Sequence, residues 1–255
     1  MLKPRCFLSL LVVTAIAIVS PIATAEEIIV SAAASLTNAF TDVGKAFERR
    51  HTDAKVVFNF GASGALLQQI EQGAPVDIFV AADQETMDKA EEKKLIDNET
   101  RKDFAGNKLV LIVPRTSTLA VSKLLDLTRP DIKHIAIGNP ETVPNGRYAR
   151  RAIEAAKPGL WEMLGSKFIF ANTVRQALDY VVRGEVDAGF VFVTDAMIAR
   201  DGVKVSMEVP LETPIVYPIS IVKDAKNAGL ADKFIQFVLS EDGVKILAGY
   251  GFLEP

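Results

Sequence analysis

The stretch VSAAASLTNAF, residues 30–40, joins a strand pattern to a helix pattern through very small side chains. EEIIV before it is typical of a buried strand, and LTNAFTDVGKAFERR after it is typical of an amphipathic helix. The start of a helix leaves backbone N–H groups unpaired and carries the positive end of the helix dipole, so it suits an anion. Three alanines beside Ser35 would let an anion approach the backbone closely. The alternative is that Ser35 is an ordinary N-cap.

The same kind of junction recurs three times along the chain. FGASGALLQQI places Ser63 at a helix start, and VPNGRYARRAI does the same for Asn145. ANTVRQAL brings Val174 into a first turn after Asn172 or Thr173 as the cap. Because helices that follow strands start at the ligand-facing edge of an open α/β sheet, we expect these starts to meet at a cleft. Amide and hydroxyl donors could hold an oxyanion there without Arg or Lys.

Strand-like and helix-like segments alternate from Glu27 onward, which predicts an α/β fold with parallel βαβ units. We expect two lobes with a ligand cleft between them. Residues 26–110 and 214–255 form the first predicted lobe, and residues 111–213 form the second. The strands KLVLIVP and TPIVYPISIV are expected to carry the chain out and back.

Residues 1–25 match a secretory signal peptide. Lys3 and Arg5 give a basic start, an apolar run follows, and Ala23 and Ala25 precede the expected cut. The run is shorter than the ~20 residues of a spanning helix. We therefore expect export to the periplasm and cleavage before Glu26.

The composition after this leader excludes several classes of site. Cys6 is the single cysteine, so the remaining chain can hold no disulfide, thiol nucleophile or thiolate metal site. His51 and His134 are not placed for a metal site. Without Lys3 and Arg5, 27 basic residues face 32 acidic ones, a net charge of −5, which argues against nucleic-acid binding. We expect no bound metal cation and no cofactor.

Five segments of the chain stand out together: AAASLTNAF, GASGALLQQIEQGAPVDIFVAAD, VPNGRYARRAI, TVRQALDYVVRGEVDAGFVFVTDA and YGF. They closely resemble the periplasmic molybdate-binding proteins of ABC transporters. The resemblance covers essentially the whole mature chain and implies a type II periplasmic-binding fold whose two lobes close on molybdate or tungstate. It also implies a non-enzymatic, monomeric protein that delivers the anion to a membrane permease.

The resemblance also implies which residues bind the ligand. Ser35 and Ser63 would donate through hydroxyl and amide, and Val174 through its backbone N–H. Asn145 stands where the family usually has an alanine that donates its backbone N–H. Phe192 stands where the family has a tyrosine whose hydroxyl reaches the ligand. The side-chain amide of Asn145 is therefore a candidate replacement for that missing donor.

Other functions stay open on the sequence alone. A sulfate-binding protein, or one for another tetrahedral oxyanion, is the nearest alternative; phosphate is disfavoured because it keeps a proton that needs an acceptor. A secreted hydrolase is more distant, because no GxSxG elbow occurs. Asp83 and Asp195 could be paired carboxylates, although helix capping or hinge support explains them more simply. Arg147, Arg150 and Arg151 either attract anions or form a solvated helix face.

Overall fold

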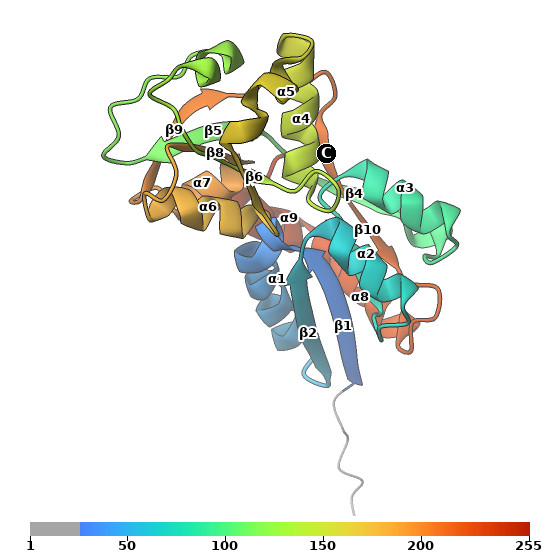
Figure 1. Ribbon diagram of the computed structural model, residues 1–255. Coiled ribbons are helices and arrows are strands. Elements are labelled where there is room, and N and C mark those ends of the chain that lie inside the picture. Colours follow the sequence, from blue (N-terminus) through green and yellow to red (C-terminus); the bar gives the residue numbers. More distant parts are fainter. Residues whose placement is uncertain (1–25) are drawn as a thin grey trace, which may run out of the picture.

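The computed structural model describes residues 26–255, so the predicted signal peptide lies outside the described residues. Two lobes are stacked in the molecule, each built on a five-stranded sheet (Figure 1). The first sheet has the order β2-β1-β3-β10-β4 and the second β7-β6-β8-β5-β9. The first contains β1 (Glu26–Ala33), β2 (Ala54–Gly61), β3 (Ile78–Val80), β4 (Lys102–Asn107) and β10 (Ile215–Ile221). The second contains β5 (Leu109–Pro114), β6 (Ile135–Gly138), β7 (Phe168–Ala171), β8 (Ala188–Phe192) and β9 (Val203–Glu208).

The helices divide between the lobes in the same way. Those of the first lobe are α1 (Thr37–Arg50), α2 (Ser63–Glu71), α3 (Gln84–Glu92), α8 (Ala228–Leu239) and α9 (Glu241–Gly249). Those of the second are α4 (Pro144–Ala156), α5 (Leu160–Leu164), α6 (Val174–Val182) and α7 (Val193–Ile198). Short 3-10 helices occur at Ala34–Leu36 (η1), Asn98–Thr100 (η2), Leu124–Thr128 (η3) and Gly165–Lys167 (η4). Within the described residues, no helix is both long and apolar enough to span a bilayer.

The sheets are mixed rather than wholly parallel. The predicted parallel pairing occurs in β1–β2, β1–β3, β6–β7 and β6–β8. However, β10 is antiparallel to β3 and β4, and β5 is antiparallel to β8 and β9. The exceptions are β10 and β5, the strands that carry the chain back into the first sheet and out into the second.

The chain passes from the first sheet to the second at Lys108 and returns between Glu208 and Ile215. Leu109 and Val110, which the sequence assigned to the first lobe, therefore belong to β5 of the second sheet. The remainder of the predicted division into lobes stays a prediction. The carboxyl end of the chain lies with the first lobe, where Leu253 pairs with Gly106.

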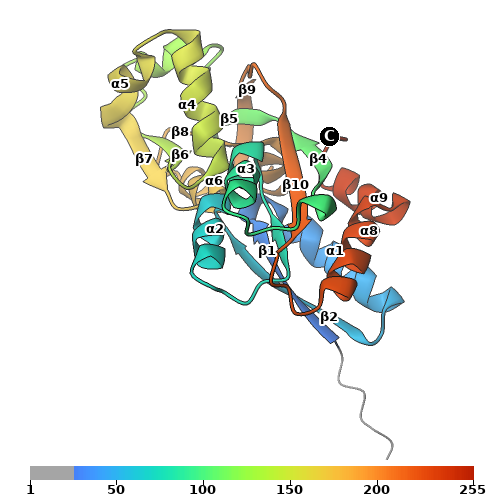
Figure 2. The ribbon, with the colours of Figure 1, turned by 90° about the vertical axis from the view of Figure 1, so that its right-hand side faces the viewer.

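Helices cover both faces of the first sheet (Figure 2). On one face, Phe47 of α1 packs edge-on against Phe234 of α8, with ring centroids 5.3 Å apart. On the other face, Leu66 of α2 and Met87 of α3 join a separate apolar cluster with Phe79 of β3. This two-sided burial explains why these strands read as continuous apolar runs.

Two of the glycines that lie against backbone stand near the starts of helices at the cavity. A Cβ on Gly146 in α4 would lie 1.9 Å from the carbonyl oxygen of Gly138, so only glycine lets this helix start against β6. A Cβ on Gly64 in α2 would lie 2.8 Å from the carbonyl oxygen of Thr142. The N–H of Gly64 donates to that same oxygen at 3.0 Å, which joins the two lobes directly.

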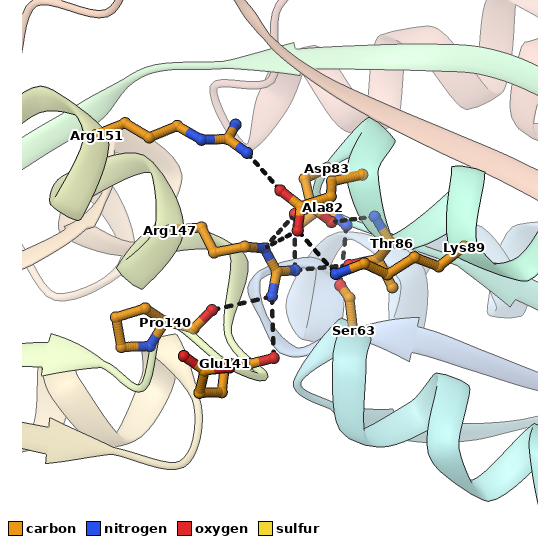
Figure 3. A network of polar contacts seen from close by, with 10 residues as sticks. Ser63, Ala82, Asp83, Thr86, Lys89, Pro140, Glu141, Arg147 and Arg151 are labelled. Carbon is orange, nitrogen blue, oxygen red and sulfur yellow. Dashed lines mark hydrogen bonds and ion pairs between the residues drawn. The ribbon is translucent and has the colours of Figure 1, made fainter.

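A buried ion pair also joins the lobes (Figure 3). From α4, Arg147 donates to Asp83 Oδ2 at 2.8 Å through Nε and to Thr86 Oγ1 at 2.6 Å through Nη2. Asp83 also caps α3 by accepting from the Thr86 N–H. Both charged residues are buried, and Arg151 of the same helix pairs with Glu85 nearer the surface. The first lobe thus holds the acidic partners and the second lobe the arginines.

A second arginine, Arg175 of α6, reaches from the second lobe to the first. Its guanidinium donates to the carbonyl of Ser35 at 3.2 Å and to Asn38 Oδ1 at 3.0 Å. Arg175 Nε lies 2.6 Å from Asp195 Oδ1, an ion-pair contact without hydrogen-bonding alignment. Asp195 is fully buried, and this burial raises its pKa to about 6, although Arg175 and the Phe192 N–H act in the opposite direction.

This carboxyl predicts a pH dependence of stability. Because the folded-state pKa lies above the ordinary value of 3.8, the folded protein binds more protons than the unfolded chain between about pH 4 and pH 6. The contribution of Asp195 to the free energy of unfolding should therefore fall by about 1–3 kcal/mol as the pH rises through that window. Denaturant unfolding of the wild type and of Asp195→Asn at several pH values isolates this term.

Asp42→Asn is the matched control. A hydrogen bond from Tyr250 lowers the pKa of Asp42, so its contribution is present above the ordinary pKa and is lost only on further acidification. The difference between wild type and Asp42→Asn should be nearly constant from pH 5 to pH 7. A difference for Asp195→Asn that is equally constant would contradict the prediction.

Candidate functional site

A small cavity lies between the lobes, with an empty volume of about 200 Å³. All five residues singled out by the sequence lie in its wall: Ser35, Ser63, Asn145, Val174 and Phe192. The rest of the wall is Ala33, Ala34, Gly61, Ala62, Ala82, Val143 and Pro144.

Ser63 is the first residue of α2 and does not act as its cap. The N-cap is Ala62, which has no side chain to bond the helix. The hydroxyl oxygen of Ser63 instead accepts the backbone N–H of Ala82 at 3.0 Å. Since a hydroxyl carries one proton and its oxygen is already accepting, the proton of Ser63 is free to donate.

Ser35 lies in the short helix η1, which runs directly into α1. The N-caps of η1 and α1 are Ala33 and Leu36, and neither makes a side-chain capping bond. The ordinary capping role considered for Ser35 is therefore absent. Its hydroxyl oxygen lies 3.0 Å from the hydroxyl of Tyr217, a fully buried residue of β10.

Asn145 is the second residue of α4, after Pro144. Its side-chain amide donates to the carbonyl of Phe190 at 2.8 Å. The sequence suggests this side-chain amide as a replacement ligand donor. In the structure the amide is hydrogen-bonded to β8. The Phe190 carbonyl takes one of the two protons of that NH₂ group. A contact between the Asn145 side chain and the ligand stays a prediction. Asn145 Oδ1 is buried without a hydrogen-bond partner.

Val174 begins α6, and its cap is Thr173 rather than Asn172. The Thr173 hydroxyl accepts the N–H of Gln176 at 3.1 Å. Among the described residues, the backbone N–H groups at the four helix starts have no backbone acceptor; these are Ser35, Ser63, Asn145 and Val174. Helix starts from both lobes therefore present unpaired donors to one cavity.

Phe192 ends β8 and supplies an apolar part of the wall. It is 1% exposed, and its ring packs edge-on against Tyr148 and Tyr217, with centroids 6.4 and 5.8 Å away. Phe192 thus contributes an apolar ring to the wall and no hydrogen-bonding group.

The wall contains no ionisable side chain, and this limits its chemistry. It offers donors, including two serine hydroxyls, but no general base that could activate them. Asp83 and Asp195 pair with different arginines, so they do not form the paired carboxylates of a hydrolase. Within the described residues, no group of three or more His, Cys, Asp and Glu side chains could hold a metal ion.

The three clustered arginines have different surroundings. Arg147 is buried between the lobes, so the solvated helix face considered for it is wrong. Arg150 is exposed and lies over the Trp161 ring at 5.4 Å, and Arg151 pairs with Glu85. Sequence reasoning also missed Arg175, whose position in the first turn of α6 gave no sign of its contact with the other lobe.

Known proteins match nearly the whole chain. The molybdate-binding protein ModA of Escherichia coli (strain K12) is 38% identical over 232 residues, 89% of this chain and 88% of that one. ModA of Haemophilus influenzae is 37% identical over 235 residues, 90% and 91% of the two chains. The solved structure of the Azotobacter vinelandii periplasmic molybdate-binding protein matches with a TM-score of 0.77 at 26% identity, covering 89% of this chain and 99% of that chain.

These similarities confirm the two-lobe α/β fold and the resemblance drawn from the sequence. They also support a binding protein rather than an enzyme. Residues 28–253 match the model of one family, described as bacterial extracellular solute-binding protein. The chain belongs to this family of bacterial extracellular solute-binding proteins.

Proposed function

We propose that this protein binds molybdate in the cavity between its lobes and delivers it to an ABC permease. The observation that carries the proposal is the convergence of four helix starts and two serine hydroxyls on one small cavity without ionisable side chains. Molybdate is a tetrahedral dianion with four oxygens that can only accept hydrogen bonds. Hydrogen-bond donors in the cavity wall are the groups that such oxygens require.

Electrostatics favour the same ligand. Each helix N-terminus carries roughly half a positive charge, so four of them offset a dianion without a buried cation. This explains how a protein of net charge −3 in its full sequence can hold an anion. The names of its relatives from Escherichia coli and Haemophilus influenzae agree, because both are molybdate-binding proteins.

The proposal extends to tungstate, which has the same shape and charge and would meet the same donors. Ser35 and Ser63 would donate through hydroxyl and amide, and Asn145 and Val174 through backbone N–H. Phe192 would contact the anion only through its ring. We further propose that the mature protein starts at Glu26, works as a monomer in the periplasm and presents both closed lobes to its permease.

Titration calorimetry with the mature protein tests the function. We expect saturable binding of molybdate and tungstate, with sulfate weaker and phosphate weakest. Phosphate keeps at least one proton near neutral pH and benefits from a carboxylate acceptor, and the cavity wall contains no Asp or Glu side chain. Sulfate binding tighter than molybdate would shift the assignment to a sulfate-binding protein, and no binding of any of these anions would refute the proposal.

Ser63→Ala should weaken molybdate binding by about 1.5–3 kcal/mol, the range for a hydrogen bond to a charged group. The free energy of unfolding should also fall, by about 1–3 kcal/mol, because the buried Ala82 N–H loses its acceptor. Ser31→Ala is the control, since Ser31 is a buried serine of β1 whose hydroxyl accepts from Asn59 outside the cavity wall. Equal affinities of the Ser63 variant and the wild type would remove this serine from the site.

Closure of the lobes around the anion should depend on Arg147. In the closed structure the guanidinium and the Asp83 carboxylate neutralise one another away from water. Removing one member of such a pair leaves the other buried and unpaired, whereas removing both is far less costly.

Arg147→Met should therefore weaken molybdate binding by about 2–5 kcal/mol, because closure would bury the Asp83 carboxylate alone. Adding Asp83→Asn should recover much of this loss, since asparagine can still cap α3. Arg150→Met removes the same charge from the exposed face of the same helix and should bind like the wild type. A double variant no better than Arg147→Met would show that the ion pair does not govern closure.

A further inference from the structure

A chain of buried polar groups runs behind the cavity and ends at Ser35. Asn107 of β4, Tyr217 of β10 and Thr194 of α7 form it, and each is at most 6% exposed. Asn107 Nδ2 donates to Tyr217 Oη at 3.2 Å and to Thr194 Oγ1 at 3.0 Å. Tyr217 Oη in turn lies 3.0 Å from Ser35 Oγ. None of the three residues behind Ser35 lies in the cavity wall.

The direction of these hydrogen bonds follows from counting protons. The backbone N–H of Lys108 donates to Asn107 Oδ1 at 2.9 Å, which fixes the amide with its NH₂ group toward Tyr217. An amide NH₂ can only donate, so the Tyr217 oxygen accepts. The phenol keeps its own proton, because burial raises the pKa of Tyr217 well above the ordinary value.

Within the described residues, the Tyr217 hydroxyl has two hydrogen-bond partners, Asn107 Nδ2 and Ser35 Oγ. Tyr217 must therefore donate to Ser35, and the Ser35 oxygen accepts. The Ser35 hydroxyl proton is then left for the cavity. The Ser63 oxygen likewise accepts a hydrogen bond, from the Ala82 N–H, so the Ser63 proton is also left for the cavity.

We propose that Tyr217 and Asn107 are positioning residues that lock the Ser35 hydroxyl as a donor toward the bound oxyanion. The inference rests on the proposed function and adds the device that makes the cavity donor-only. A serine hydroxyl that is free to rotate can accept as well as donate, and would tolerate a protonated anion. Locked donors instead favour anions without a proton, such as molybdate, over hydrogen phosphate.

The test is Tyr217→Phe, which keeps the ring and removes the hydroxyl. It thereby breaks the hydrogen-bond relay that runs from Asn107 through Tyr217 to Ser35. We expect the affinity for molybdate to fall by about threefold to tenfold, as for the loss of one hydrogen bond. Affinity for phosphate at neutral pH, measured by displacement of molybdate, should fall less or rise. The ratio of the two affinities should therefore shrink.

Tyr148→Phe is the matched control. Tyr148 is also buried and packs on Phe192, but it lines a different cavity, together with Arg151 and Thr213. Its loss of a hydroxyl should leave the ratio of affinities as in the wild type. If Tyr217→Phe behaves like Tyr148→Phe, or if it weakens molybdate and phosphate equally, the relay is refuted.

Asn107→Asp gives a second, independent measurement. A carboxylate in place of the amide accepts the Tyr217 proton, so Ser35 would have to donate to Tyr217 and turn its oxygen lone pairs to the ligand. Measured above neutral pH, where phosphate is mainly the hydrogen phosphate dianion, the added charge repels both dianions alike, so a lower preference for molybdate over phosphate reports the reversed hydrogen bonds. An unchanged preference would overturn the proposal. A wild type that binds no oxyanion would instead refute the proposed function itself.

Discussion

The close approach of helix starts from two lobes is the constraint on which the rest of this structure depends. Backbone N–H groups can surround a small anion only if the side chains near them are small. Alanine and glycine therefore occupy the wall around Ser35 and Ser63, and Gly64 touches the backbone of Thr142 across the cleft. The lack of bulk at VSAAASLTNAF is thus a property of the cavity edge rather than a defect in a core.

Charge is kept out of the cavity and placed around it. Arg147 and Arg175 each cross from the second lobe to the first, and each is matched by a buried carboxylate. Neutral donors in the wall can then meet an anion without a competing carboxylate or a permanently bound counter-ion. Both arginines join the two lobes through hydrogen bonds. In the function we propose, the wall would bind the anion and these arginines would hold the lobes closed.

Much of this was readable from the sequence, because local patterns set it. The strand-to-helix junctions identified Ser35, Ser63, Asn145 and Val174, and the structure brings all four to one cavity. The mixed pairing of β5 and β10 was missed, since strand direction depends on where the chain crosses between lobes. The burial of Arg147 was missed because a basic helix position looks solvated until the other lobe is in place. Tyr217 gave no signal at all, being 182 residues from its partner Ser35.

Phe192 contributes no hydroxyl to the cavity wall, and the hydrogen bond between Tyr217 and Ser35 is nevertheless present. A tyrosine there would add a group that both donates and accepts, whereas the Phe192 ring does neither and leaves Tyr217 hydrogen-bonded to Ser35 and Asn107 behind it. The Asn145 amide donates one of its two N–H protons to the Phe190 carbonyl. In the arrangement we propose, each serine hydroxyl is held in one orientation by an N–H or O–H group behind it. Affinity would then be set by the number of donors in the wall, and selectivity by the groups behind the wall that hold these hydroxyls as donors.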